Sequence, residues 1–286
     1  FRMIHSCLDP IDTAMDHPKP AANILGIHLE GPFLAPDFKG SMPGHLLKRP
    51  DLELFEKYQR QADGRITYIT VAPEAEGALD LIRELHRQGI VISIGHSGAD
   101  YDTAMEAIHS GAASATHIFN AMKPLHHHAP AISGAALESD IYCEAICDGR
   151  HLHPGIVRLV LKAKGLDRVI AVTDSIMATG LPDGDYMLGV NKIRVTGGDA
   201  RLISDGTRAG STLTTINALK NLIKFTGRKM EELIPLLTAN PASLLGISGR
   251  KGAVAVGKDA DLVLLDDETN VDTTIVNGSI VYQNIQ

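Results

Sequence analysis

A chain of 286 residues is long enough for one large domain, and an α/β barrel of about 250 residues fits as a single unit. The 27 basic and 34 acidic side chains give a net charge of −7 that is spread along the chain, which argues against nucleic acid or an anionic membrane surface as the main partner. No apolar run reaches the roughly 18 residues of a membrane-spanning helix, and residues 1–10 do not have the pattern of a signal peptide. We therefore expect a soluble, unexported protein.

The chain has three cysteines, Cys7, Cys143 and Cys147, an odd number without a paired spacing. This pattern predicts no disulfide framework and favours a reducing cytoplasm. Cys143 and Cys147 lie in an apolar run, so we interpret them as buried thiols rather than as metal ligands.

The first part of the chain alternates short β-rich runs with amphipathic helical stretches, which is the pattern of a parallel sheet wrapped by helices. Six strands are predicted, at residues 24–29, 66–71, 90–94, 115–119, 141–147 and 169–172. Helices are predicted over residues 51–62, 75–88, 101–110 and 154–164.

The pattern changes after the sixth predicted strand. Residues 180–206 are polar and Gly-rich, and we interpret them as a hairpin over the mouth of the barrel; two closing helices are expected over residues 211–225 and 230–238. From Gly252 onward the hydrophobic period is two, and strands are predicted at residues 260–265, 273–276 and 279–282. The sequence thus predicts a barrel catalytic domain over residues 1–251 and the C-terminal part of a small β-sandwich over residues 252–286.

Six strand–helix units are two short of a closed (β/α)₈ TIM barrel, and an open barrel would expose unpaired backbone groups at its edges. Either the chain begins about two strands into the barrel, or its sheet is open and of another class. The C-terminal strands also lack partners, which in a split sandwich would come from the front of the chain. We therefore expect an α/β barrel whose first strands are missing.

Five predicted strands end in a carboxylate or an imidazole, and in a parallel barrel these ends meet at one mouth. A single such residue is more often a turn cap than a catalyst. Together, one Glu and two His supply ligands that suit Zn²⁺ or a similar divalent ion with a position left for water. Asp174, at the end of the sixth predicted strand, is placed to take and deliver a proton. His151 is placed to donate a hydrogen bond to an oxyanion. The side chains concerned are Glu30, His96, His117, His151 and Asp174.

The strand-end segments resemble the N-acetylglucosamine-6-phosphate deacetylase family of the amidohydrolase superfamily, in order and spacing, from about residue 21 to the C-terminus. The segments are His-Leu-Glu-Gly-Pro-Phe at 28–33, Ala-Pro-Glu at 72–74, Gly-His-Ser at 95–97, Thr-His-Ile-Phe-Asn-Ala-Met at 116–122, Asp-Gly-Arg-His at 148–151, Thr-Asp at 173–174 and Ala-Gly-Ser-Thr-Leu at 209–213. The tail from Asn240 resembles the ending of many superfamily members.

The resemblance implies hydrolysis of the acetamide of N-acetylglucosamine-6-phosphate by a cytoplasmic homodimer. It also implies a divalent metal ion, with Zn²⁺ as the preferred ion and Fe²⁺, Mn²⁺ or Co²⁺ as alternatives. Whether a second ion binds stays open, because the family's His-x-His pair precedes the segments found here. By this resemblance Glu30, His96 and His117 bind the metal, Asp174 is the general base and acid, and His151 polarises the acetyl carbonyl. Asn120 and Ala121 contact the sugar phosphate, largely through backbone N–H groups.

Two positions depart from the family pattern. His128 stands where the family usually has an Arg that contacts the phosphate, and a His cannot form the bidentate Arg fork. His45 ends a loop, Lys39 to His45, in which the family's His comes earlier. We interpret the run His126 to His128 as a solvated or phosphate-facing loop rather than a metal site.

Three functions remain open at this point. The first is the amino-sugar phosphate deacetylase. The second is a related amidohydrolase acting on another N-acyl sugar phosphate, such as the galactosamine isomer, or on a cyclic amide. The third is a metal-free remnant with a structural role, which the series Glu30, His96, His117 and Asp174 speaks against.

Overall fold

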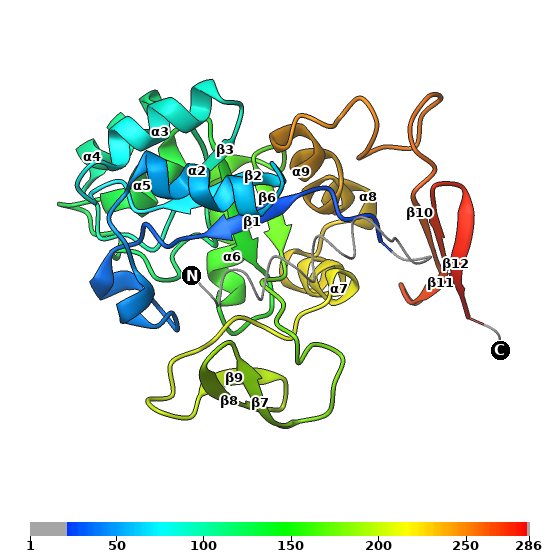
Figure 1. Ribbon diagram of the computed structural model, residues 1–286. Helices are drawn as coiled ribbons and strands as arrows, with labels where there is room; N and C mark the ends of the chain where they lie inside the picture. Colours follow the sequence, from blue (N-terminus) through cyan, green and yellow to red (C-terminus); the bar gives the residue numbers. More distant parts are fainter. Residues whose placement is uncertain (1–21, 285–286) are drawn as a thin grey trace.

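The computed structural model describes residues 22–284, and its centre is a six-stranded, fully parallel sheet in the order β1-β2-β3-β4-β5-β6 (Figure 1). The strands are β1 (Ile27–Glu30), β2 (Ile66–Val71), β3 (Val91–Ile94), β4 (Ala112–Ala115), β5 (Tyr142–Ile146) and β6 (Val169–Val172). Five of the six predicted strands are therefore present near their predicted positions, whereas the fourth, predicted at residues 115–119, is formed by residues 112–115. All six pair in chain order. The sheet curls into a half-barrel, so the predicted barrel architecture is confirmed in these six strands.

Five helices follow the first five strands, and from the second helix to the fifth each packs against the next (Figure 1). They are α2 (Leu52–Gln61), α3 (Ala78–Arg87), α4 (Tyr101–His109), α5 (Ala131–Glu138) and α6 (Pro154–Lys164). Side-chain caps fix where two of them begin, because Asp51 accepts a hydrogen bond from the backbone of Leu54 and Asp100 accepts one from Thr103. The helices bury their apolar faces against the sheet in one continuous core.

Helix α5 is absent from the elements expected from the sequence. Its eight residues, AISGAALE, have no apolar stripe, since Ala131, Ile132, Ser133, Ala135 and Ala136 are all buried. A helix that is buried on most sides has no amphipathic period to detect.

Strand β4 also differs from the expectation, because it ends at Ala115 and not at Phe119. The backbone turns immediately afterwards, with left-handed φ values of 30° at His117, 72° at Phe119 and 49° at Ala121. Those conformations cannot continue a strand. The apolar residues Ile118 and Phe119 extend the hydrophobic run in the sequence, yet they lie in a tight loop.

The Gly-rich excursion is a three-stranded antiparallel sheet rather than a simple hairpin, and it projects from one end of the barrel sheet (Figure 1). Its strands are β7 (Gly184–Leu188), β8 (Asn191–Thr196) and β9 (Asp199–Leu202). After it come α7 (Thr215–Thr226), α8 (Met230–Leu233), a 3₁₀ turn η3 (Ile234–Leu237) and α9 (Ala239–Leu244). The second closing helix, predicted over residues 230–238, is therefore split into α8 and η3 at Pro235, and α9 follows it.

The C-terminal strands form a separate antiparallel sheet, β10 (Leu262–Leu265), β11 (Val271–Val276) and β12 (Ser279–Gln283), set apart from the barrel (Figure 1). The predicted small β element is thus confirmed, whereas the exact division at residues 251 and 252 stays a prediction. Cys143 and Cys147 are free and buried, as expected, and Cys7 lies outside the described residues.

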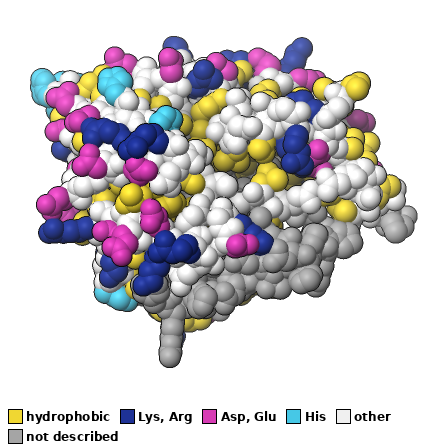
Figure 2. Space-filling model, turned by 45° about the horizontal axis from the view of Figure 1, so that its top comes forward, with side chains coloured by type: hydrophobic (Ala, Val, Ile, Leu, Met, Phe, Trp, Pro, Cys, Tyr) yellow, Lys and Arg dark blue, Asp and Glu magenta, His cyan; other side chains and the backbone are white. Residues whose placement is uncertain are grey.

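Two surface features bear on the sequence expectations. On the face drawn in Figure 2, basic and acidic side chains are interspersed and do not gather in one patch of a single sign. None of the helices in residues 22–284 combines the length and the hydropathy that crossing a bilayer requires.

Candidate metal centre and active site

The functional side chains predicted at the strand ends lie at the carboxyl edge of the half-barrel. Glu30 is the last residue of β1, and His96, His117 and Asp174 each come two residues after the end of β3, β4 and β6. These last three all have left-handed φ values, of 48°, 30° and 51°. A non-glycine residue in that region costs of order 1 kcal/mol or more, and such strain clusters at functional sites. The surrounding structure must therefore stabilise a strained backbone conformation at all three strand ends.

Glu30, His96 and His117 form a compact group of possible metal ligands. Glu30 Oε1 lies 3.0 Å from His96 Nε2 and 2.8 Å from His117 Nε2, and the two Nε2 atoms are 3.1 Å apart. Among the described residues this is the group of three or more His, Cys, Asp or Glu side chains whose ligand atoms lie within 4.8 Å of one another. The structure therefore brings the three predicted metal ligands together.

Hydrogen bonds around the imidazoles fix which nitrogen faces the centre. His96 Nδ1 donates to the carbonyl oxygen of Phe38 across 2.7 Å, because that oxygen can only accept, and Nε2 is thus the nitrogen that faces Glu30. The Nδ1 atom of His117 is buried, and no group in the described part of the chain bonds to it. Both rings nevertheless point Nε2 at the same carboxylate oxygen.

The close packing of acid and imidazole shifts the titration of both. Burial alone would raise the pKa of Glu30, but hydrogen bonds from His117 and His96 outweigh it and hold the pKa well below its ordinary value. Burial alone would lower the pKa of His117, but its hydrogen bond to Glu30 and the charge of that carboxylate raise the pKa to about 9. The Glu30 carboxylate therefore favours a positive charge next to it, which is here the proton of His117.

Asp174 lies beside this group. It lines the same cavity of about 230 Å³ as Glu30 and His117, inside the half-barrel. Burial, and then the negative charge of Glu30, raise the pKa of Asp174 to about 6. A carboxylate with that pKa accepts protons more readily than an exposed one and is still ionised at neutral pH, which are the properties of a general base.

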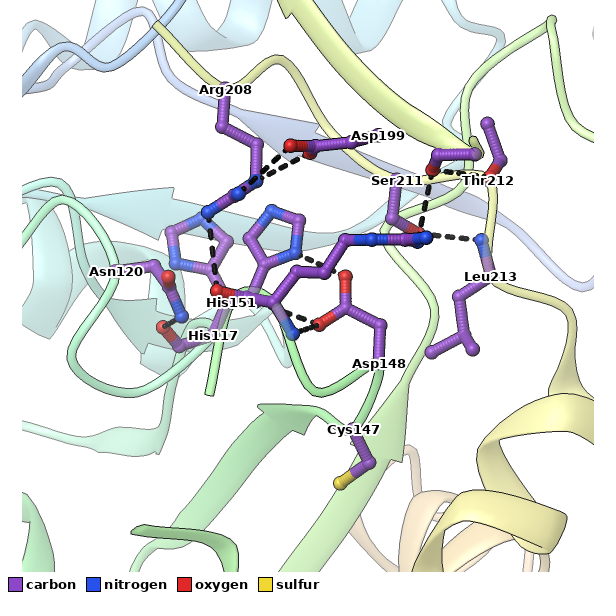
Figure 3. A network of polar contacts seen from close by, with 12 residues as sticks. His117, Asn120, Cys147, Asp148, His151, Asp199, Arg208, Ser211, Thr212 and Leu213 are labelled. Atoms are coloured by element: carbon purple, nitrogen blue, oxygen red, sulfur yellow. Dashed lines mark hydrogen bonds and ion pairs between the residues drawn. The ribbon is translucent and has the colours of Figure 1, made fainter. Parts of the chain in front are cut away.

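His151 is held by a residue to which the sequence analysis gave no role. Asp148 Oδ2 accepts a hydrogen bond of 2.6 Å from His151 Nδ1, while Oδ1 accepts from the backbone N–H groups of His151 and Arg150 at 2.7 Å (Figure 3). Both side chains are almost fully buried. Asp148 thus fixes the ring orientation of His151 and leaves Nε2 free to face a substrate. The motif Asp-Gly-x-His contained this pair, although spacing alone did not show the contact.

The small sheet β7–β9 is attached to the loop that carries His151 (Figure 3). The Arg150 guanidinium donates to the carbonyl oxygens of Gly197 and Gly198, in the turn between β8 and β9. Arg208 makes a bidentate ion pair with Asp199 at 2.8 and 3.1 Å, and it also donates to the backbone oxygen of Arg150. The sheet expected over the barrel mouth is therefore tied to one side of the site.

The three predicted substrate contacts other than His151 lie in two places. The Asn120 amide donates to the backbone oxygens of His117 and Ile118, which places Asn120 and Ala121 in the loop next to the metal-ligand group. His128 is exposed and lines a different hollow, of about 460 Å³, together with Lys123 and Tyr101. The structure thus does not place His128 in the cavity that Glu30 and Asp174 line, and His45 is also exposed, in a 3₁₀ turn.

The sequence of this chain is similar to those of known proteins. A family model described as the amidohydrolase family matches residues 6–281. The chain belongs to this family. The amidohydrolase is 42% identical over 262 residues to the N-acetylglucosamine-6-phosphate deacetylase of Bacillus subtilis (strain 168), covering 91% of this chain and 66% of the relative. It is 34% identical over 278 residues to the N-acetylgalactosamine-6-phosphate deacetylase of Escherichia coli O157:H7, covering 97% and 73%.

A solved structure supports the assignment of this chain to the amidohydrolase family. A variant of N-acetyl-D-glucosamine-6-phosphate deacetylase from Mycobacterium smegmatis, in complex with N-acetyl-D-glucosamine-6-phosphate, matches with a TM-score of 0.91 and 33% identity over 97% of this chain and 73% of that one. The chain spans about two thirds of the length of its curated relatives. The resemblance seen in the strand-end motifs is therefore confirmed at the level of the whole described fold.

Proposed function

We propose that this chain hydrolyses the acetamide of N-acetylglucosamine-6-phosphate, giving glucosamine-6-phosphate and acetate, with a divalent metal ion held by Glu30, His96 and His117. The observation that carries the proposal is the convergence of these three side chains at one point, where Glu30 and His117 line the same cavity of the half-barrel as Asp174. The names of the B. subtilis relative and of the ligand in the M. smegmatis complex supply the substrate. A metal-free structural role is disfavoured because it would leave this buried ligand group without a purpose.

The three ligand atoms suit a metal ion in their spacing and chemistry. Two atoms bound at about 2.0 to 2.1 Å to a tetrahedral ion are about 3.3 Å apart, and the separations here are 2.8, 3.0 and 3.1 Å. The group would have to open by only a few tenths of an ångström. One carboxylate and two imidazoles are ligands of catalytic Zn²⁺, so we propose Zn²⁺ first, with Fe²⁺, Mn²⁺ or Co²⁺ as alternatives.

Each residue around the proposed metal position has its own role in the reaction. When bound, the ion would acidify a water molecule and polarise the acetyl carbonyl. Asp174 takes the proton from water as its oxygen bonds to the acetyl carbon, and then delivers that proton to the sugar nitrogen as the carbon–nitrogen bond breaks. Acetate and the free amine result. Nε2 of His151, whose ring Asp148 orients, faces the carbonyl oxygen and stabilises it as that oxygen gains negative charge.

The substrate contacts proposed for Asn120, Ala121 and His128 concern the phosphate. Asn120 and Ala121 lie in the loop that follows His117, where the Asn120 backbone N–H donates to the His117 carbonyl oxygen at 3.0 Å, so a contact of that N–H with a bound sugar phosphate would have to replace this bond. His128 lies in its own hollow with Lys123, so a contact from His128 requires a different route, such as a second copy of the chain. Comparing KM for the phosphorylated and the unphosphorylated sugar in His128→Ala measures how much His128 contributes to phosphate binding.

We also propose that the chain works as a cytoplasmic homodimer. Two buried, unpaired thiols, Cys143 and Cys147, suit a reducing compartment, and burial raises the pKa of each to about 12, which keeps them unreactive. The exposed loop His126 to His128 is available to a second copy. Light scattering should then give twice the mass of one chain.

The deciding experiment measures acetate release from the N-acetyl-6-phosphates of glucosamine and galactosamine, with and without added Zn²⁺. The glucosamine isomer should be the better substrate by kcat/KM. The galactosamine isomer is the second candidate because the E. coli relative carries that name. Release of acetate from neither sugar, in a preparation that binds the metal, would contradict the proposed activity.

The pKa of His117 predicts a pH dependence of metal binding. A metal that takes Nε2 must displace the proton that a pKa of about 9 places there at neutral pH. The apparent Kd should therefore rise roughly tenfold for each pH unit below about 9 and level off above it. Calorimetric titration in buffers of different ionisation enthalpy, between pH 7 and 8, should show about one proton released per ion bound. A Kd that stays constant over this range would contradict the assignment.

The Asp148–His151 contact predicts a second result. Asp148→Asn keeps an oxygen for the two backbone N–H groups but places an amide opposite Nδ1 of His151, which can then no longer donate to it. We expect kcat to fall by about 10- to 10²-fold, with metal content unchanged, because the donor to the carbonyl oxygen loses its orientation. Asp167→Asn, at an exposed aspartate, is the matched control and should behave as wild type. Equal loss in both variants would remove the contact from the mechanism.

A further inference from the structure

Glu74 is a strand-end carboxylate that the proposed chemistry does not use. It follows β2 in the turn Ala72-Pro73-Glu74, whose backbone is anchored by hydrogen bonds from Ala72 to the Phe33 carbonyl oxygen at 2.9 Å and from Ala75 to Ala72 at 3.1 Å. The side chain is exposed on one side, so burial did not force it into its contacts. Its position therefore calls for another explanation.

Both carboxylate oxygens of Glu74 are bonded to the two residues that directly follow His96. Oε2 accepts from the Ser97 hydroxyl at 2.7 Å, and Oε1 accepts from the Gly98 backbone N–H at 2.5 Å. The Ser97 hydroxyl oxygen in turn accepts from the backbone of Ala99 at 3.0 Å. Glu74 thus bonds directly to Ser97 and Gly98, and it is linked to Ala99 through the Ser97 hydroxyl.

The opposite side of this segment is held by Phe38. A Cβ atom added at Gly98 would lie 2.5 Å from the Phe38 ring, so Gly98 packs directly on that ring and no side chain fits between them. The Phe38 carbonyl oxygen accepts from Nδ1 of His96 at 2.7 Å. The segment from His96 to Gly98 is therefore clamped between Glu74 and Phe38, which explains how His96 is kept at its left-handed φ of 48°.

The same clamp reaches the loop proposed to bind the sugar phosphate. The backbone N–H of Ser97 donates to the Ala121 carbonyl oxygen at 3.0 Å, and the Ser97 carbonyl oxygen accepts from Lys123 at 2.9 Å. Ser97 is fully buried between these partners. A shift of Ser97 would therefore move His96 on one side and Ala121 on the other.

We propose that Glu74 is a positioning residue that sets the place of His96 and of the Ala121 loop together, through Ser97 and Gly98. The part of this inference that concerns the sugar phosphate rests on the proposed function, whereas the part that concerns the metal does not. Hydrogen-bonding partners outside the ligand set commonly contribute 10- to 100-fold to metal affinity. A carboxylate with two bonds to one ligand-bearing segment is such a partner.

The test compares Glu74→Ala with Glu74→Gln and with Glu76→Ala. Alanine removes both acceptors, whereas glutamine can accept from the Gly98 N–H and donate to the Ser97 hydroxyl oxygen. Glu76 is the matched control, because its carboxylate is exposed and pairs with the exposed Arg49 across 2.8 Å. The readouts are the Kd for Zn²⁺ alone, by competition with a chelator, the thermal midpoint, and kcat and KM for acetate release.

We expect Glu74→Ala to bind Zn²⁺ about tenfold more weakly or worse and to raise KM, Glu74→Gln to recover most of the loss, and Glu76→Ala to match wild type. A lower thermal midpoint with an unchanged Kd in Glu74→Ala would overturn the proposal, since it would show a structural role only. The Kd for Zn²⁺ is measured without substrate and therefore tests the role of Glu74 independently of the deacetylase activity. If Zn²⁺ affinity falls in Glu74→Ala but the wild type releases no acetate, the role of Glu74 stands. That result would contradict only the proposed deacetylase activity.

Discussion

Replacing Asp174 by asparagine should lower kcat by about 10²-fold or more while leaving metal content and KM close to wild type. Asparagine has the size of aspartate but cannot take a proton from water or deliver one to the leaving nitrogen. The buried position of Asp174, which raises its pKa to about 6, is what makes the carboxylate a competent base at neutral pH. Its backbone oxygen, which accepts from the Ser211 N–H at 2.7 Å, is unaffected by the exchange.

The control for this variant is Asp205→Asn, in the same excursion between β6 and α7. Asp205 is exposed and caps a turn by accepting from the Thr207 backbone at 2.9 Å, so its loss should not touch the site. Steady-state kinetics and metal analysis of both variants give the answer. Turnover within a few fold of wild type in Asp174→Asn would exclude the residue as the proton carrier.

The side chains that meet at the metal position could be predicted because their placement follows from topology. Glu30 and His117 are 87 positions apart in the chain and 2.8 Å apart in space. Parallel strands in chain order put their carboxyl ends at one edge, so a residue just after a strand is brought there whatever its distance in sequence. The order of the strands was therefore enough to expect the contact, although His117 lies two residues beyond the end of β4 and not inside a strand.

The residues that hold the site were not predictable in the same way. The Asp148–His151 and Glu74–Gly98 contacts depend on the local shape of loops with left-handed turns, and no hydrophobic period encodes that shape. The end of β4 was missed for the same reason, since the apolar Ile118 and Phe119 lie in a loop rather than in a strand. Short-range motifs such as Ala-Pro-Glu pointed to these positions without giving their contacts.

The prediction for His96 concerns the metal itself. His96→Ala should lose the tightly bound ion, which we expect at about one per chain in the wild type, because the variant leaves only Glu30 and His117 as protein ligands. The fold should survive, since the Glu30–His117 pair at 2.8 Å stays in place and the buried carboxylate keeps a charged partner in protonated His117. Elemental analysis after dialysis measures the metal, and thermal unfolding checks the fold. His109→Ala, at an exposed histidine near the end of α4, is the matched control and should keep its metal. If His96→Ala retained the full metal content of the control, the ion would have to bind elsewhere, and the ligand set Glu30, His96 and His117 would be wrong.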